Sequence, residues 1–310
     1  MPPHHFLDLA DFNAASLRRI LSHAHATKAA RGGRPRGAAD ATAPLEGRML
    51  AMIFERPSTR TRVSFQVAMR QLGGDSIIIS AGDTQLGRGE TVADTARVLS
   101  RYADAIMIRA SDHSHLTELA AKSSVPVING LTSKSHPCQV MADIQTIEER
   151  LGPLSQRTVA WVGDGNNVAA SWIHGVARLG GTLRLACPEA LAPAPELIGW
   201  AQGQAGVVEL VRTPEEAVAG ADCVITDAWT SMHDTDSASR HNLLQPYQVN
   251  ERLMAQAASQ AIFLHCLPAH RGEEVTDAVI DGAQSVVFDE AENRLHVQKS
   301  ILLHCFGALA

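Results

Sequence analysis

Short apolar runs alternate along this chain with longer segments in which apolar residues recur every three or four positions. Runs of the first kind predict buried strands, and the longer spacing predicts helices with one apolar face. The predicted strands are Arg48–Phe54, Ser76–Ser80, Ala105–Arg109, Val125–Asn129, Thr158–Val162, Thr182–Ala186, Val207–Val211, Cys223–Thr226, Ala261–His265 and Ser285–Phe288. Helical spacing is clear in Ala14–Ala30, Arg62–Leu72, Glu90–Tyr102, Cys138–Leu151 and Val168–Leu179.

Strands that alternate with helices indicate buried parallel sheets covered by helices on both faces. We therefore expect an α/β protein of two domains, each a parallel sheet flanked by helices, with helices that run between the domains. The expected division is 1–150 and 151–290, with a seam near Gly152-Pro153. A last helix in 291–310 is expected to return to the first domain, and Arg31–Ala43 reads as a surface loop.

Composition narrows the class of partner. The chain has 310 residues, 45% of them hydrophobic, and a net charge of −6. That charge argues against nucleic acid as the main partner, and no apolar run is long enough to cross a bilayer. The first residues carry acids where a targeting peptide would have bases, so we expect a cytoplasmic protein. Five cysteines without a C-x-x-C motif suggest neither a disulfide framework nor a zinc finger.

Polar clusters follow three strands of the first half. Ser58-Thr59-Arg60-Thr61-Arg62 comes after a strand and opens a helix, whose free N–H groups and partial positive charge suit a phosphate. A simple capped helix with solvent-facing arginines is the alternative. Arg109 ends a later strand, and His136-Pro137-Cys138-Gln139 opens another helix. Either could equally be an ordinary surface or cap residue.

Three more clusters follow strands of the second half. Gly163-Asp164-Gly165-Asn166-Asn167 resembles a dinucleotide-binding turn, but Val168 stands where the third glycine belongs. Asp227 to Met232 offers a carboxylate for an ammonium group. In His265-Cys266-Leu267-Pro268, a metal site or a Cys-His nucleophile is an alternative, but His265 is expected to point away from Cys266. Six clusters after six strands predict a ligand-binding cleft.

These motifs, in this order, resemble the aspartate/ornithine transcarbamoylase family. Ser58–Arg62 is similar to its carbamoyl-phosphate signature, His136–Gln139 to its second phosphate-side motif, and His265–Pro268 to the signature of the ornithine branch. The stretches around Gln85 and Arg294 resemble that branch as well. One departure is His233, which stands where the family's S-M-G loop has glycine.

The resemblance implies two sets of binding residues. Carbamoyl phosphate would be bound by Ser58, Thr59, Arg60, Thr61, Gln85, Arg109, His136, Pro137, Cys138, Gln139, Cys266, Leu267 and Arg294. Ornithine would be bound by Asn167, Asp227, Ser231 and Met232. Catalytic roles fall on Arg60, Arg109, His136, Asp227 and Cys266.

The implied reaction transfers the carbamoyl group of carbamoyl phosphate to the side-chain amine of L-ornithine, giving citrulline and phosphate, and it is expected to require no metal and no cofactor. The resemblance also implies a homotrimer or a multiple of trimers, and we expect a role in arginine biosynthesis. Other amine acceptors (putrescine, aspartate or an acylated ornithine), a nicotinamide-dependent oxidoreductase using the Gly163 turn, and a non-catalytic paralogue are the alternatives.

Overall fold

The computed structural model describes residues 3–80, 82, 89–230 and 237–309, and it divides into two compact units. Unit 1 comprises 1–138 and 294–310, and unit 2 comprises 139–293. Each unit is described by itself. The predicted boundaries at 150 and 290 remain predictions of where the functional domains divide.

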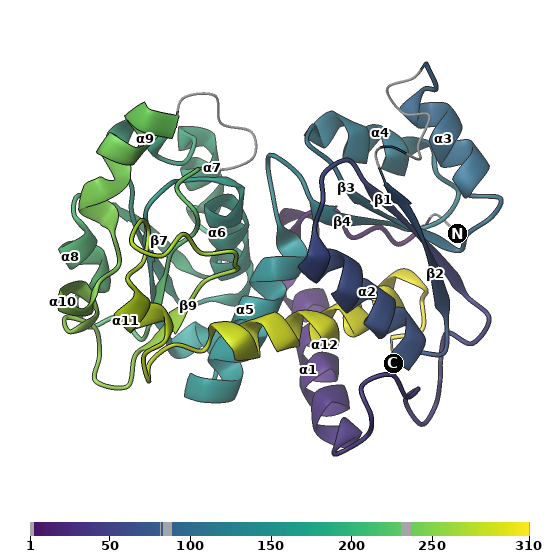
Figure 1. Cartoon of the computed structure of the whole chain (residues 1–310), viewed down its shortest axis with the longest axis horizontal. Helices are drawn as coiled ribbons and strands as arrows, with labels where there is room; N and C mark the ends of the chain where they lie inside the picture. Colours follow the sequence, from purple (N-terminus) through teal and green to yellow (C-terminus); the bar gives the residue numbers. More distant parts are fainter. Residues whose placement is uncertain (1–2, 81, 83–88, 231–236, 310) are drawn as a thin grey trace. The chain divides into compact units, whose positions relative to one another are not determined.

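Unit 1 is built on a four-stranded parallel sheet in the order β2-β1-β3-β4. Its strands are β1 (Met49–Phe54), β2 (Asp75–Ser80), β3 (Ala105–Arg109) and β4 (Val127–Leu131). Figure 1 shows helices α3 (Val92–Leu99) and α4 (His113–Lys122) on one side of this sheet and α2 (Thr59–Gln71) on the other. Coverage of both faces explains why β1 and β3 are almost uniformly apolar.

Alternation along the strands places successive side chains on opposite faces of this sheet. Ile53 and Ile106 pack in a cluster with Leu116 and Leu119 of α4. Near the start of the chain, the unit also contains η1 (Leu9–Asp11) and α1 (Ala14–Arg31). Helix α1 ends at Arg31, where the predicted surface loop begins.

Unit 2 contains a five-stranded parallel sheet in the order β7-β6-β5-β8-β9. The strands are β5 (Thr158–Val162), β6 (Thr182–Ala186), β7 (Val207–Val211), β8 (Cys223–Ile225) and β9 (Ile262–Leu264). The helices of this unit's described residues are α6 (Asn167–Leu179), α7 (Pro195–Ala201), α8 (Pro214–Val218), α9 (Ser237–Leu244), α10 (Glu251–Met254) and α11 (Asp277–Ile280). Short 3-10 turns are η2 (Leu154–Gln156), η3 (Glu189–Leu191) and η4 (Gln245–Tyr247).

One face of the second sheet packs against short helices. Val162, Val224 and Phe263 form a buried cluster with residues of α8, α10 and α11, whereas α6 contacts β6 and β7. Two helices contain the unit boundaries: α5 (Pro137–Leu151) and α12 (Val287–Cys305). None of the helices in the described part of the chain is long and apolar enough to span a membrane.

The predicted fold class is therefore confirmed, with one strand wrong. Ser285–Phe288 was predicted as a strand, but only Ser285 forms an isolated bridge, to Phe263, and α12 begins at Val287. A short apolar run cannot by itself distinguish a strand from the first turn of a helix. The helix predicted to begin at Arg62 starts at Thr59, so the signature lies within its first turn.

Candidate functional site

Both sheets reverse their strand order at one point, which is where open parallel sheets bind ligands. In unit 1 the order reverses between β1 and β3, and in unit 2 between β5 and β8. In each unit, most of the described residues predicted for the site follow these two strands and the strand beyond, which is β4 in unit 1 and β9 in unit 2, whereas Arg294 lies in α12. The same three topological positions thus carry the candidate chemistry in both units.

In unit 1 the loop after β1 begins a thirteen-residue helix, α2. Ser58 caps that helix, because its hydroxyl accepts a hydrogen bond from the backbone N–H of Thr61 at 3.4 Å. The first N–H groups of a helix lack intrahelical partners, so the start of α2 offers donors and a positive end to an anion. Thr59 is exposed and Arg60 is half-buried at this end of the helix.

The fully buried hydroxyl of Thr61 connects three elements of unit 1. It accepts hydrogen bonds from Arg294 at 2.8 Å and Arg109 at 3.4 Å, and the Ser58 hydroxyl donates to it at 3.1 Å. Two guanidinium groups from β3 and α12 are therefore held at the start of α2. We call Ser58, Thr59, Arg60, Thr61, Arg109, His136 and Arg294 the cationic half-site.

A carboxylate holds the ends of β1 and β3 together beside these residues. Glu55 accepts a hydrogen bond from the Ser111 N–H at 2.8 Å and contacts the His115 ring at 2.5 Å. Its own N–H donates to the Arg109 carbonyl at 3.0 Å. These contacts fix the strand end that carries Arg109.

His136 lies between β4 and α5 and is 3% exposed. Burial, followed by the charges of Arg294, Arg109 and Arg60, holds the pKa of His136 well below its usual value. The imidazole is therefore neutral near pH 7, and it can donate one N–H without adding a charge. These three guanidinium groups make the surroundings of His136 positive.

The two residues after His136 are also buried. Pro137 is the first residue of α5, and the Cys138 thiol donates to the Asn129 carbonyl at 3.3 Å. Burial raises the pKa of Cys138 to about 12, so it is a structural thiol rather than a thiolate.

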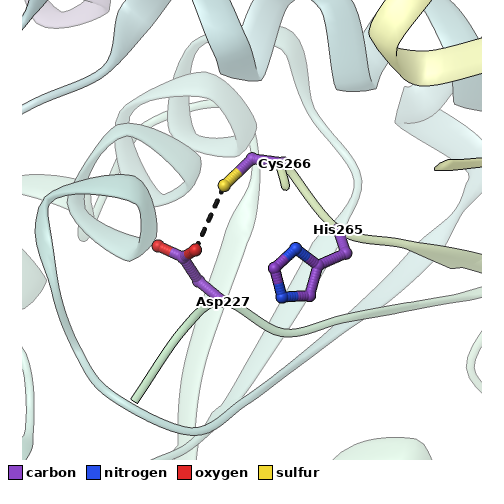
Figure 2. A group of neighbouring side chains, drawn as sticks. All are labelled: Asp227, His265 and Cys266. Carbon is purple, nitrogen blue, oxygen red and sulfur yellow. Dashed lines mark hydrogen bonds between the residues drawn. The ribbon is translucent and has the colours of Figure 1, made fainter. Parts of the chain in front are cut away.

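In unit 2 the equivalent residues surround a carboxylate. Asp227 follows β8, and its Oδ1 accepts a hydrogen bond from the Cys266 thiol at 3.1 Å. Figure 2 shows these two side chains pointing toward one another, with the imidazole of His265 beside the carboxylate. Asn166 donates to the Asp227 Oδ2 at 2.8 Å. We call Asn166, Asn167, Asp227, Cys266 and Leu267 the acidic half-site.

Two buried acids deepen the negative character of this half-site. The Gln139 amide donates to Asp143 and Glu290, both at 2.8 Å, and Glu290 also accepts the His265 N–H at 2.9 Å. Gln139 was predicted to bind carbamoyl phosphate, and here both its N–H donors contact these carboxylates within unit 2. That predicted role remains untested.

Desolvation and the negative charges nearby raise the pKa of Cys266 far above the usual value. Desolvation is the largest cause, followed by the Asp227 charge, the hydrogen bond to Asp227, and the charges of Glu290 and Asp143. Cys266 is therefore a neutral thiol that donates to Asp227. This state does not suit the nucleophilic role considered from the sequence, because the thiolate is the reactive form.

His265 was expected to point away from Cys266, and this expectation is wrong. Donor atoms of Asp227, His265 and Cys266 all lie within 4.8 Å of one another. The His265 Nδ1 accepts the Leu267 N–H at 2.9 Å, which places the ring proton on Nε2, facing Glu274 at 3.2 Å. Both ring nitrogens are thus engaged, so the histidine offers no free lone pair to a metal. Leu267 adopts a φ of 57°, in the left-handed region.

The Gly163–Asn167 turn is filled by the chain's own residues. A side chain at Gly165 would meet the Leu191 carbonyl at 2.5 Å and Pro193 at 2.6 Å. The space in which a dinucleotide pyrophosphate would approach that glycine is therefore occupied. Asn166 caps α6 by accepting from the N–H groups of Val168 and Ala169, and Asn167 begins the helix.

Some residues that shape the candidate site were not predicted from the sequence. Asn166 was recognisable as a helix cap but not as the partner of Asp227. Arg240 of α9 forms an ion pair with Asp164 and donates to the Trp229 carbonyl at 3.2 Å, joining the turns after β5 and β8. No local motif marks it. The predicted residues Gln85, Ser231 and Met232, and the atypical His233, lie outside the described residues.

Two family models match the chain. The aspartate/ornithine carbamoyltransferase carbamoyl-P binding domain matches residues 4–149, and the Asp/Orn binding domain of the same family matches residues 155–305. The chain belongs to the aspartate/ornithine carbamoyltransferase family. The resemblance in the motifs is thereby confirmed.

Relatives in this family match over nearly the whole chain. An ornithine carbamoyltransferase of Rhodopseudomonas palustris strain BisA53 is 60% identical over 99% of this chain and 98% of its own length. The solved ornithine carbamoyltransferase of Pyrococcus furiosus is 48% identical with a TM-score of 0.92, covering 97% of this chain and 96% of that one. An anabolic ornithine carbamoyltransferase of Campylobacter jejuni is 38% identical with a TM-score of 0.90, covering 98% and 99%.

Proposed function

We propose that this carbamoyltransferase-family chain transfers the carbamoyl group of carbamoyl phosphate to the side-chain amine of L-ornithine, giving L-citrulline and phosphate. One observation carries the proposal beyond family membership. In the cationic half-site three arginines surround His136, and in unit 2 Asp227 of the acidic half-site, together with Asp143 and Glu290, places three carboxylates around Cys266. The first suits an anion and the second an ammonium group, which are the charges of these two substrates.

On the phosphate side, the start of α2 and Arg60 hold the phosphate oxygens. Ser58, Thr59 and Thr61 contribute hydroxyls or backbone N–H groups, and Arg294 adds a second guanidinium. As the C–O bond to phosphate breaks, the leaving group gains negative charge. Fixed cations and helix N–H groups stabilise that charge without reorganising.

At the carbamoyl group, Arg109 and His136 donate hydrogen bonds to the carbonyl oxygen. That oxygen becomes negative when the amine nitrogen attacks the carbamoyl carbon. A neutral His136 supplies an N–H donor there while adding no further positive charge. Removal of one such donor typically costs about 2.7–4 kcal/mol of barrier.

On the amine side, Asp227 and the Cys266 thiol orient the ornithine side chain. The attacking amine must be deprotonated, so activity should rise toward alkaline pH as more of the amine loses its proton. The nitrogen lone pair forms the new C–N bond, the C–O bond to phosphate breaks, and the proton left on nitrogen is released. Asn167, Ser231 and Met232 are proposed to bind the amino-acid end of ornithine.

Four finer assignments are part of the same proposal. Cys266 and Leu267 also contact the carbamoyl group, and Gln85, Pro137, Cys138 and Gln139 complete binding of carbamoyl phosphate. The chain assembles as a trimer or a multiple of trimers, and it serves arginine biosynthesis. The relative from Campylobacter jejuni is an anabolic ornithine carbamoyltransferase, which supports that direction.

The experiment is a citrulline assay with carbamoyl phosphate and one amine at a time. Ornithine, putrescine and aspartate are offered at equal concentrations, and the carbamoylated product is identified by mass. We expect turnover with ornithine to exceed that with either other amine by at least a hundredfold. Preferred use of putrescine or aspartate would reassign the acceptor, and phosphate release without a carbamoylated amine would refute transfer.

A further inference from the structure

One histidine and two carboxylates, His270, Glu273 and Glu274, lie together in unit 2, in the loop that follows Cys266. The His270 Nδ1 is 3.8 Å from Glu273 Oε2 and 3.8 Å from Glu274 Oε2. One donor atom from each of these three residues lies within 4.8 Å of the other two. None of the three is among the residues proposed above to bind or transform substrate.

The backbone of this loop is fixed by hydrogen bonds. The Glu273 N–H donates to the His270 carbonyl and the Gly272 N–H donates to the Val275 carbonyl, both at 2.9 Å. The Gln248 side chain donates to the carbonyls of Gly272 and Glu273 at 2.9 and 2.8 Å. The three donor side chains therefore project from a rigid turn.

Glu274 supplies an independent sign that a ligand is missing from this turn. Its side chain is fully buried. Oε1 accepts the His270 N–H at 2.6 Å and faces the His265 Nε2 at 3.2 Å. Oε2 has no hydrogen-bond partner among the described residues, and it faces His270. Leaving a buried carboxylate oxygen without a partner typically costs about 1–3 kcal/mol or more.

We propose that His270, Glu273 and Glu274 form a binding site for a divalent transition-metal ion of the zinc class. Imidazole nitrogen and carboxylate oxygen are ligands that such ions accept, at about 2.0–2.2 Å each. The two separations of 3.8 Å are shorter than the sum of two such bonds, about 4.2 Å, so one ion can bridge each pair. The ion satisfies Glu274 Oε2, the oxygen that lacks a donor.

A bound metal ion explains the positions of His270, Glu273 and Glu274 better than a direct ion pair between His270 and the two carboxylates does. At 3.8 Å, His270 is beyond hydrogen-bond distance from either carboxylate. Glu273 Oε2 also lies 3.1 Å from the His241 Nε2 of α9, so a second imidazole stands next to the site. His241 is the candidate fourth ligand, and a water molecule is the other.

The test is calorimetric titration of the chelator-treated full chain with zinc chloride. We expect one ion per chain, with affinity reduced at least tenfold by His270→Ala and by Glu273→Gln. Both side chains are substantially exposed, so the variants should fold, and circular dichroism checks this. Glu209→Gln, at an exposed carboxylate elsewhere in unit 2, is the matched control and should bind as the unaltered chain does.

Cys266→Ser separates this site from the neighbouring group of Asp227, His265 and Cys266. Zinc binding should survive the Cys266→Ser change. In the unaltered chain, cobalt bound in place of zinc should show no thiolate-to-metal charge-transfer band. Zinc binding that is lost in Cys266→Ser but kept in His270→Ala overturns the proposal, as does the absence of any saturable binding. Because binding rather than citrulline is measured, the result is independent of the proposed reaction.

Discussion

The cationic half-site of unit 1 and the acidic half-site of unit 2 occupy the same topological places but differ in charge. Each follows the central strand of its parallel sheet and the next two strands beyond the reversal of order. In unit 1 these places hold Arg60, Arg109 and His136, and in unit 2 they hold Asp227 and Cys266. One sheet architecture therefore carries side chains of opposite charge at its carboxyl edge, because residues at and after the strand ends vary while the strands keep their arrangement.

A buried titratable group reports the charge of each half-site. Arginines help to lower the pKa of His136, and carboxylates help to raise the pKa of Cys266. Both groups remain neutral near pH 7, although their neighbours differ in sign. Each can then donate a hydrogen bond without adding a charge to its surroundings.

The largest effect is expected from Arg60→Gln, which removes a cation from unit 1. Turnover should fall about 10²–10³-fold, by analogy with the loss of one preorganised transition-state donor. The KM for carbamoyl phosphate should rise, while that for ornithine changes little. Steady-state kinetics with each substrate varied in turn makes the measurement.

The matched control is Arg97→Gln, which removes an exposed arginine of α3 paired with Asp94. It should behave as the unaltered enzyme does. Intact turnover and carbamoyl-phosphate binding in Arg60→Gln would falsify the anion assignment of the cationic half-site.

The second-largest effect is expected from Asp227→Asn, which removes a negative charge from unit 2. Loss of a charged partner for the amine should cost about 1.5–3 kcal/mol, or roughly ten- to a hundredfold in kcat/KM for ornithine. The KM for carbamoyl phosphate should stay near its original value. Equal loss for both substrates would show that Asp227 supports the structure rather than the amine.

A smaller effect is expected at Cys266. Serine retains a donor to Asp227 and alanine does not, so kcat/KM for ornithine should fall several-fold more in Cys266→Ala than in Cys266→Ser. Iodoacetamide should label Cys266 slowly at pH 8, because its raised pKa leaves little thiolate. Rapid labelling compared with a free cysteine peptide would contradict a neutral thiol.

The smallest effect concerns stability and pH. The folded pKa of His136 lies below its unfolded value near 6.5, so below that pH the unfolded chain binds a proton that the folded chain refuses. This contribution to stability is complete above about pH 6.5 and is lost as the pH falls toward the folded pKa. One proton changes the free energy of unfolding by at most about 1.4 kcal/mol per pH unit.

Urea unfolding between pH 5 and pH 7 measures that slope. The His136→Gln variant should reduce the dependence of the unfolding free energy on pH by an amount that corresponds to less than one proton. Other histidines with lowered pKa, including His23 and His113, contribute to the same slope, so it should not vanish. An unchanged slope in the variant would mean that His136 is also protonated in the folded chain.

The sequence predicted the sheets and the motif residues more accurately than their contacts. Apolar runs located nine of the strands, because helices on both faces require such runs. Ser285–Phe288 was wrong because α12 begins at Val287, so that half of this short apolar run belongs to the first turn of a helix, where Phe288 is exposed. His265 was misplaced because strand alternation no longer governs a residue after β9 ends, where Leu267 adopts a positive φ.

Long-range partners had no local signal. Thr61 and Arg294 are 233 residues apart in the chain, and Arg240 reaches Asp164 over 76 residues. Polar identity marks each of these as a possible donor or acceptor, but only the folded chain selects the pair. The segment containing Ser231 and Met232, and that containing Gln85, keep their roles as predictions.

The division of the chain has a consequence for synthesis on the ribosome. Unit 2 is one continuous stretch, whereas unit 1 needs both 1–138 and 294–310. At about 5–20 residues per second, Arg294 emerges on the order of 10–50 s after Thr61, its hydrogen-bond partner. The cationic half-site, although encoded first, is therefore completed last, and a nascent chain lacks Arg294 beside Thr61 at a time when unit 2 has already been synthesised in full.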